Sequence, residues 1–130
     1  MVILDTHIWL WWINEDSEKL KPVWVKTIEQ EPCAAISSIS LFEVSWLSHH
    51  GRIKLPTDIV TWLIEATQHS LIEVLPINPE IAQIAVSLPY HHRDPQDRLI
   101  IASAIFHKAT LISADTTFGK YEELKQYLLS

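Results

Sequence analysis

The N-terminal stretch MVILDTHIWLWWI, residues 1–13, decides the fold class. Residues 2–5, VILD, form a short aliphatic run that ends in a carboxylate, which predicts a buried strand. Between residues 6 and 13 the spacing of Trp and Ile predicts a helix. The stretch is too short to span a membrane, has no basic start and contains Asp5 and His7. Because a carboxylate in apolar surroundings needs partners, we expect Asp5 to belong to a polar site.

Strand and helix signals alternate along the rest of the chain. The further predicted strands are residues 34–38, 72–75 and 110–113, and the further predicted helices are residues 17–31, 40–51, 56–70, 79–89, 94–108 and 121–129. No Ser/Gly-rich or charged linker interrupts this order, so we expect residues 1–130 to form a single domain. Strands separated by helices need crossover connections. The sequence therefore predicts an α/β fold with a central, mostly parallel sheet of four to five short strands flanked by helices.

The composition excludes several classes of protein. At 48% hydrophobic residues the chain can bury a core, which excludes intrinsic disorder. Its 16 acidic and 10 basic residues give a net charge of −6, which argues against a polycationic nucleic-acid binder. The single cysteine, Cys33, excludes an intramolecular disulfide and a cysteine zinc cluster, and it favours an intracellular, cytoplasmic location.

Four acids are expected to meet at one edge of the sheet. Asp5, Glu43 and Asp115 each follow a predicted strand, and the carboxyl ends of parallel strands lie together. Asp97 starts the helix before the last strand, and a right-handed crossover begins that helix at the same edge. Four carboxylates in one crevice repel one another and need a cation. An all-oxygen site favours Mg²⁺ or Mn²⁺, which indicates metal-assisted hydrolysis.

Each acid also has an ordinary structural interpretation, which is weakest for Asp5 because an acid in apolar surroundings is costly without a partner. Asp94 and Asp97 stand at a helix start, where they can cap free N–H groups and interact favourably with the helix dipole. Ser40 and Glu43 have the spacing of a capping box. Asp115 can be a turn residue. The hypothesis of a metal site therefore depends on the four acids converging.

The histidines are not expected to bind metal. His49-His50 and His91-His92 are adjacent pairs, whose side chains diverge if they lie on a helix. His7 follows Asp5 by two residues and is interpreted as a packing or supporting residue. No histidine, serine or cysteine has the surroundings of a nucleophilic catalytic site.

Several ordered motifs resemble the PIN-domain family, and within it the VapC-type ribonuclease toxins of toxin–antitoxin pairs. The matching stretches are MVILDTHIWLWW, SSISLFEVSWL with GRIKL, HHRDPQDRLIIASAI and TLISADTTFGKY, which together cover nearly the whole chain. The resemblance implies a Mg²⁺-dependent endoribonuclease in which Asp5, Glu43, Asp97 and Asp115 hold the metal and carry out catalysis. It implies supporting positions at Thr6 and Ser113. Asp94 either caps its helix, the interpretation we favour, or extends the acidic pocket, and Gln96 replaces an aromatic residue that many relatives carry.

The resemblance also implies partners. These are an RNA substrate, a cognate antitoxin protein and a second copy of the chain in a homodimer. Arg93 and Arg98 flank the acids and are candidates for contacts with RNA phosphates, as are Arg52 and Lys54, although exposed cations of this kind are common on any surface. Two alternatives remain open at this point: a PIN nuclease of housekeeping RNA processing, and a non-catalytic receiver-like or protein-interaction domain.

Overall fold

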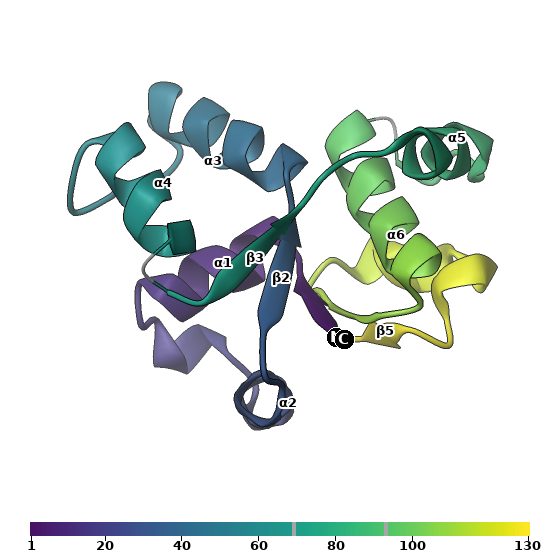
Figure 1. Cartoon of the computed structure of the whole chain (residues 1–130), viewed down its shortest axis with the longest axis horizontal. Coiled ribbons are helices and arrows are strands. Elements are labelled where there is room, and N and C mark those ends of the chain that lie inside the picture. The colour runs from purple at the N-terminus through teal and green to yellow at the C-terminus, as the bar shows by residue number, and fades with distance from the viewer. Residues whose placement is uncertain (69, 93) are drawn as a thin grey trace.

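A computed structural model describes residues 1–68, 70–92 and 94–130. Its centre is a five-stranded sheet in the order β3-β2-β1-β4-β5, and every neighbouring pair is parallel (Figure 1). The predicted α/β fold with a mostly parallel sheet is therefore confirmed. The elements are β1 (Val2–Leu4), α1 (Thr6–Ile13), α2 (Pro22–Gln30), β2 (Ala34–Ser37), α3 (Ile39–His49), α4 (Ile59–Gln68), β3 (Ile72–Leu75), α5 (Pro79–Ser87), α6 (Pro95–His107), β4 (Thr110–Ile112) and β5 (Leu128–Leu129), with short 3₁₀ turns at Ser17–Lys19 (η1), Thr116–Lys120 (η2) and Glu122–Leu124 (η3).

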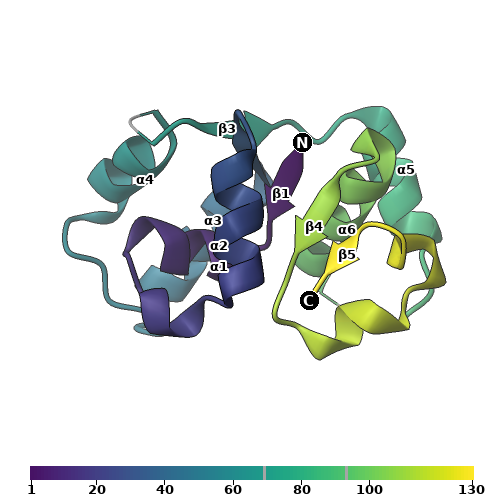
Figure 2. The same ribbon diagram turned by 90° about the horizontal axis from the view of Figure 1, so that it is seen from below.

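The sheet is buried on both faces because its side chains alternate between two apolar cores. Val2 and Leu4 of β1 belong to the core shared with α1, α2 and α4, whereas Ile3 belongs to the core shared with α6 and the C-terminal turns. Figures 1 and 2 show helices α1 to α4 on one side of the sheet and α5, α6 and the C-terminal turns on the other. Among the described residues, no helix has the length and apolar character that crossing a membrane requires.

The register brings the carboxyl ends of the central strands to the same level. Leu4 lies opposite Ile112, and the Asp5 N–H continues the ladder by donating to the Ile112 carbonyl at 3.0 Å. Asp5 directly follows β1 and Ser113 directly follows β4, so these two residues lie next to each other. Helix α6 begins at this edge and leads to β4, as a crossover between parallel strands requires. The fold therefore gathers residues from three distant segments at one edge.

Two predicted helices are wrong. Residues 121–129 form the turn η3 and strand β5, because Leu111 donates to the Tyr127 carbonyl at 2.8 Å and β5 extends the sheet beside β4. Tertiary pairing here overrides the helix propensity of the segment. Residues 17–31 form η1 and α2 separately, because Pro22 forces Lys21 into an extended conformation and starts a new helix.

Arg98 is a structural residue. Its side chain is buried, and the guanidinium donates to the carbonyls of Leu88 at 2.6 Å and Pro89 at 2.8 Å, with longer contacts to Val86 and His92. These bonds fix the segment between α5 and α6 on the side of α6. The structure therefore contradicts the prediction that Arg98 contacts RNA phosphates.

Replacing Arg98 by Met is expected to lower the free energy of unfolding by about 3 kcal/mol, because buried carbonyl groups lose their charged donor. Urea unfolding followed by circular dichroism measures the change. The matched control is Arg52→Met, since Arg52 is exposed and its loss should change stability by less than about 0.5 kcal/mol. Equal stability of the two variants would show that Arg98 does not hold this segment.

Candidate metal-binding site

The four predicted acids lie at the carboxyl edge of the sheet. Asp5 directly follows β1, Asp97 lies in the first turn of α6, and Asp115 precedes the turn η2 after β4. Glu43 projects from α3, the helix after β2. The charges of Asp5, Glu43 and Asp115 each raise the pKa of Asp97, so the four carboxylates lie close enough to repel one another.

Asp5 is held from both sides. Its Oδ1 accepts the Thr6 backbone N–H at 2.6 Å, and its Oδ2 accepts the Ser113 hydroxyl at 2.7 Å. Ser113 Oγ in turn accepts the backbone N–H of Asp115 at 3.0 Å. Ser113 therefore connects the acid after β1 to the acid after β4, and it does so at the position predicted to support the site.

Thr6 connects Asp5 to helix α3. Its hydroxyl donates to Glu43 Oε1 at 2.9 Å and lies 2.8 Å from the Ser40 hydroxyl. Ser40 and Glu43 are therefore not a capping box: α3 begins at Ile39 after Ser38, and both side chains turn toward Thr6. The three-residue spacing that resembles a cap instead places a serine and a carboxylate on the face of α3 that meets the end of β1.

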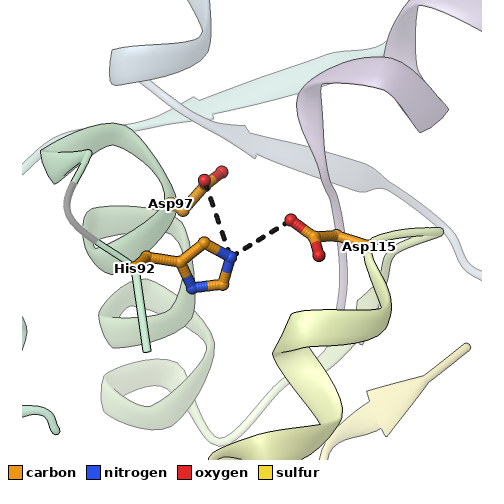
Figure 3. Close-up of side chains that lie close together, drawn as sticks. All are labelled: His92, Asp97 and Asp115. Carbon is orange, nitrogen blue, oxygen red and sulfur yellow. Dashed lines mark hydrogen bonds and ion pairs between the residues drawn. The ribbon is translucent and has the colours of Figure 1, made fainter. Parts of the chain in front are cut away.

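His92 is the residue of this site that the sequence analysis missed. Its Nε2 lies 3.1 Å from Asp115 Oδ2 and 3.7 Å from Asp97 Oδ2, so the ring stands between the two carboxylates (Figure 3). One ligand atom from each of the three residues falls within 4.8 Å of the other two. The prediction for the adjacent histidines assumed a helix, but His91 and His92 precede α6 in a loop. The helix start at Asp94-Pro95, which the sequence does show, is the signal that could have placed them outside it.

Three of the acids have raised pKa values. Burial raises the pKa of Asp5 despite its hydrogen bonds from Ser113 and Thr6. Burial, followed by the charges of Asp5 and Asp94, raises the pKa of Glu43, although the Thr6 hydroxyl opposes this. Burial and the charge of Asp5 raise the pKa of Asp97 to about 7, with His92 opposing. Without a cation the ionised cluster is therefore unfavourable.

Asp115 behaves differently. Burial alone would raise its pKa, but the hydrogen bonds from His92 and from the Thr117 backbone N–H lower it below its usual value. It is therefore ionised at neutral pH beside acids that resist ionisation.

A closely spaced set of carboxylates that repel one another is the donor chemistry that fits a divalent cation, because the ion removes the repulsion. Asp97 and Asp115 offer carboxylate oxygens that lie together in this cluster, and Asp5 and Glu43 are close enough for their charges to raise the pKa of Asp97.

A hollow of about 480 Å³ adjoins the acids. Glu43, Asp97, Asp94, Arg52 and Gln96 are among the residues that line it. Asp94 stands at the N-cap position of α6, as predicted, but within the described residues its side chain makes no capping hydrogen bond, and its charge raises the pKa of Glu43. Asp94 therefore lines the hollow beside Glu43 and Asp97, and its side chain does not cap the helix as the favoured interpretation predicted.

The other polar residues that the sequence analysis singled out do not all line this hollow. Gln96 lines this hollow, but its Oε1 is buried and has no hydrogen-bond partner in the part of the chain that the structure describes. Lys54 lines a different hollow, next to Asn14 and Asp16. The prediction for Arg93 lies outside the described residues.

Comparison with known sequences assigns the chain to a family. The PIN domain profile matches residues 2–124, which is nearly the whole sequence. The chain belongs to the PIN domain family. This agrees with the fold and with the acids gathered at the edge of the sheet.

A curated relative and several solved structures are similar to this PIN domain. Ribonuclease VapC22 of Mycobacterium tuberculosis is 36% identical over 115 residues, which cover 88% of this chain and 86% of that protein. VapBC2 of Rickettsia felis, bound to a DNA fragment from its promoter, superposes with a TM-score of 0.70 at 22% identity, covering 99% of this chain and 98% of that one. A toxin–antitoxin complex of Klebsiella pneumoniae gives 0.62 at 19% identity, covering 100% and 97%. At these identities the two structures show the fold.

The raised pKa of Asp97 predicts an increase in stability for Asp97→Asn. Between an unfolded pKa near 3.8 and a folded pKa of about 7 the folded state binds more protons, so ionisation of Asp97 costs stability as pH rises. In EDTA at pH 8, Asp97→Asn should therefore raise Tm by roughly 3–5 °C, the shift for about 1 kcal/mol after solvent screening. The increase should vanish below about pH 4.

Asp115→Asn is expected to change Tm in the opposite direction from Asp97→Asn. Its pKa is lowered in the folded state, so its ionised form stabilises the fold above the unfolded pKa, and the substitution should lower Tm at pH 8. The loss should diminish as pH falls through the depressed folded pKa. Thermal unfolding of both variants between pH 3 and pH 8 tests the pair, and shifts of the same sign would contradict this account of the site.

Proposed function

We propose that this PIN domain is an endoribonuclease that depends on a divalent metal ion, Mg²⁺ or Mn²⁺, and is the toxin of a toxin–antitoxin pair. The observation that carries the proposal is the convergence of four carboxylates, three with raised pKa values, beside an open hollow. The 36% identity to a protein named as a ribonuclease supports RNA as the substrate. A phosphodiester bond is the substrate group that such a site serves best.

The chain's own residues divide the work of hydrolysis between them. Asp5, Asp97 and Asp115 would hold the ion, which when bound lowers the pKa of water and offsets charge on the phosphate. Ser113 and the Thr6 N–H fix the orientation of the Asp5 carboxylate. Glu43, on the wall of the hollow with a raised pKa, is placed to take the proton of the attacking water.

Binding of RNA needs groups that recognise phosphate. Arg52 lines the same hollow as Glu43 and Asp97, and it supplies a cation for a phosphate next to the one that is cleaved. Arg93 remains a candidate for a second phosphate contact.

We further propose that a cognate antitoxin protein binds this chain. Helices α3 and α4 expose Phe42, Trp46, Val60 and Ile64 on neighbouring surfaces, and a hollow of about 410 Å³ lies beside Phe42 and Trp46. Exposed apolar residues of this density are typical of a protein-binding surface. The similar structures from Rickettsia felis and Klebsiella pneumoniae are of toxin–antitoxin systems, which supports the same kind of partner here. We also propose that the chain forms a homodimer and acts in the cytoplasm.

The central test is cleavage of RNA by Asp5→Asn. Asp5 is buried and its carboxylate is the centre of the hydrogen-bond network, so replacing its charge removes a metal ligand with little change in shape. Cleavage of total RNA should require Mg²⁺ or Mn²⁺, stop in EDTA and fall at least about 100-fold in the variant. Expression of the variant should also no longer arrest growth.

The control is Asp16→Asn, which changes a half-buried acid at the N-terminus of η1, away from the cluster. It should cleave RNA at the rate of the unmodified chain. Undiminished cleavage by Asp5→Asn, in protein purified free of host ribonucleases, would disprove the proposed function. Mapping the ends of the products from the unmodified chain would identify the target sequence.

A further inference from the structure

His92 is a buried titratable group to which the proposed chemistry gives no role. Only 10% of its side chain is exposed, and its Nε2 faces the gap between Asp97 and Asp115 (Figure 3). The three residues come from the loop before α6, from α6 itself and from the end of β4. Their ligand atoms are the three that lie within 4.8 Å of one another.

The imidazole ring is held in one orientation by aromatic residues. Its Nδ1 lies 3.0 Å from the Tyr121 hydroxyl, and the His92 backbone N–H donates to the same oxygen at 3.0 Å. The ring stacks on Tyr121 with an interplanar angle of 5° and meets Phe118 edge-on. Because Tyr121 and Phe118 are fully buried, Nε2 has a fixed direction toward the two acids.

The backbone of His92 is also fixed. Its carbonyl accepts a long bond, 3.5 Å, from the Arg98 guanidinium, which binds the preceding carbonyls more tightly. The loop is therefore attached to the same helix that carries Asp97. Position and orientation together place one nitrogen at a site otherwise made of oxygen atoms.

We infer that His92 Nε2 is a ligand of the divalent ion and that this nitrogen makes the site prefer Mn²⁺ to Mg²⁺. The inference rests on the proposed function and deepens it by naming the metal. When the ion binds, Nε2 would give up the proton that it donates to Asp115, and the remaining ring N–H would lie on Nδ1. A ligating histidine donates that N–H to a second group, and the Tyr121 oxygen has a lone pair free to accept it in addition to the backbone N–H. Mn²⁺, a first-row transition metal, accepts a nitrogen ligand more readily than Mg²⁺, which prefers oxygen ligands and water.

The direct test is pulsed electron paramagnetic resonance of the unmodified chain loaded with Mn²⁺. A coordinated imidazole should give nitrogen-14 modulation of the electron spin echo, and His92→Ala should abolish it. His91→Ala is the matched control, because His91 is the neighbouring histidine but is exposed, and it should keep the signal. This measurement on the unmodified chain needs no variant to fold.

Calorimetric titration with each metal alone tests the preference. His92→Ala should weaken Mn²⁺ binding at least about 10-fold while changing Mg²⁺ binding less. His92→Gln should give the same result if His92→Ala does not fold. Absence of nitrogen modulation, or binding of Mn²⁺ by His92→Ala as tightly as by the unmodified chain or more tightly, would overturn the inference, since the histidine would then be a competitor of the ion.

The two proposals fail in different ways. If the unmodified chain binds neither Mn²⁺ nor Mg²⁺, both the proposed function and the role of His92 are wrong. If Asp97→Asn loses metal binding but His92→Ala keeps it without a change in preference, only the role of His92 is wrong. RNA cleavage is not needed to separate these results.

Discussion

Repulsion among carboxylates at the carboxyl edge of the sheet is the constraint on which the site depends. Asp5 is buried between two hydrogen-bond donors and cannot move away from Asp97 and Asp115. Burial is the largest cause of the raised pKa values of Asp5, Glu43 and Asp97, and the negative charges of neighbouring acids raise them further. A fold that keeps such a cluster gives up stability for function, and the cluster is relieved by a divalent ion. The net charge of −6, which argues against simple binding of nucleic acid, owes four negative charges to this cluster and so becomes part of the means of holding a phosphate through a metal.

The rest of the structure holds the acids in place. Parallel pairing sets the ends of β1 and β4 side by side, and the crossover through α6 returns Asp97 to the same edge. Ser113 and Thr6 then connect the strand ends to one another and to α3. Arg98 anchors the loop that carries His92. A buried arginine outside the acid cluster thereby fixes the backbone of the loop that carries His92.

The features that the sequence predicts well are those set by local pattern. The strand that ends at Asp5, the alternation of strands and helices and the position of Asp97 at a helix start all follow from hydrophobic runs and helix boundaries. The features it misses depend on contacts between distant residues. Residues 128–129 become a strand because β4 offers a free edge, Ser40 and Glu43 serve Thr6 instead of a helix cap, and Arg98 is buried by carbonyls ten residues away. His92 was missed because its contact with Asp115 depends on the tertiary fold.

The most direct measurement is a crystal structure of the chain grown with Mn²⁺, in which anomalous scattering locates the ion. The account predicts an anomalous peak between Asp97 and Asp115, beside Asp5 and within bonding distance of a carboxylate oxygen. A peak elsewhere on the surface, or none at a Mn²⁺ concentration that supports RNA cleavage, would contradict the claim that these acids form a metal site.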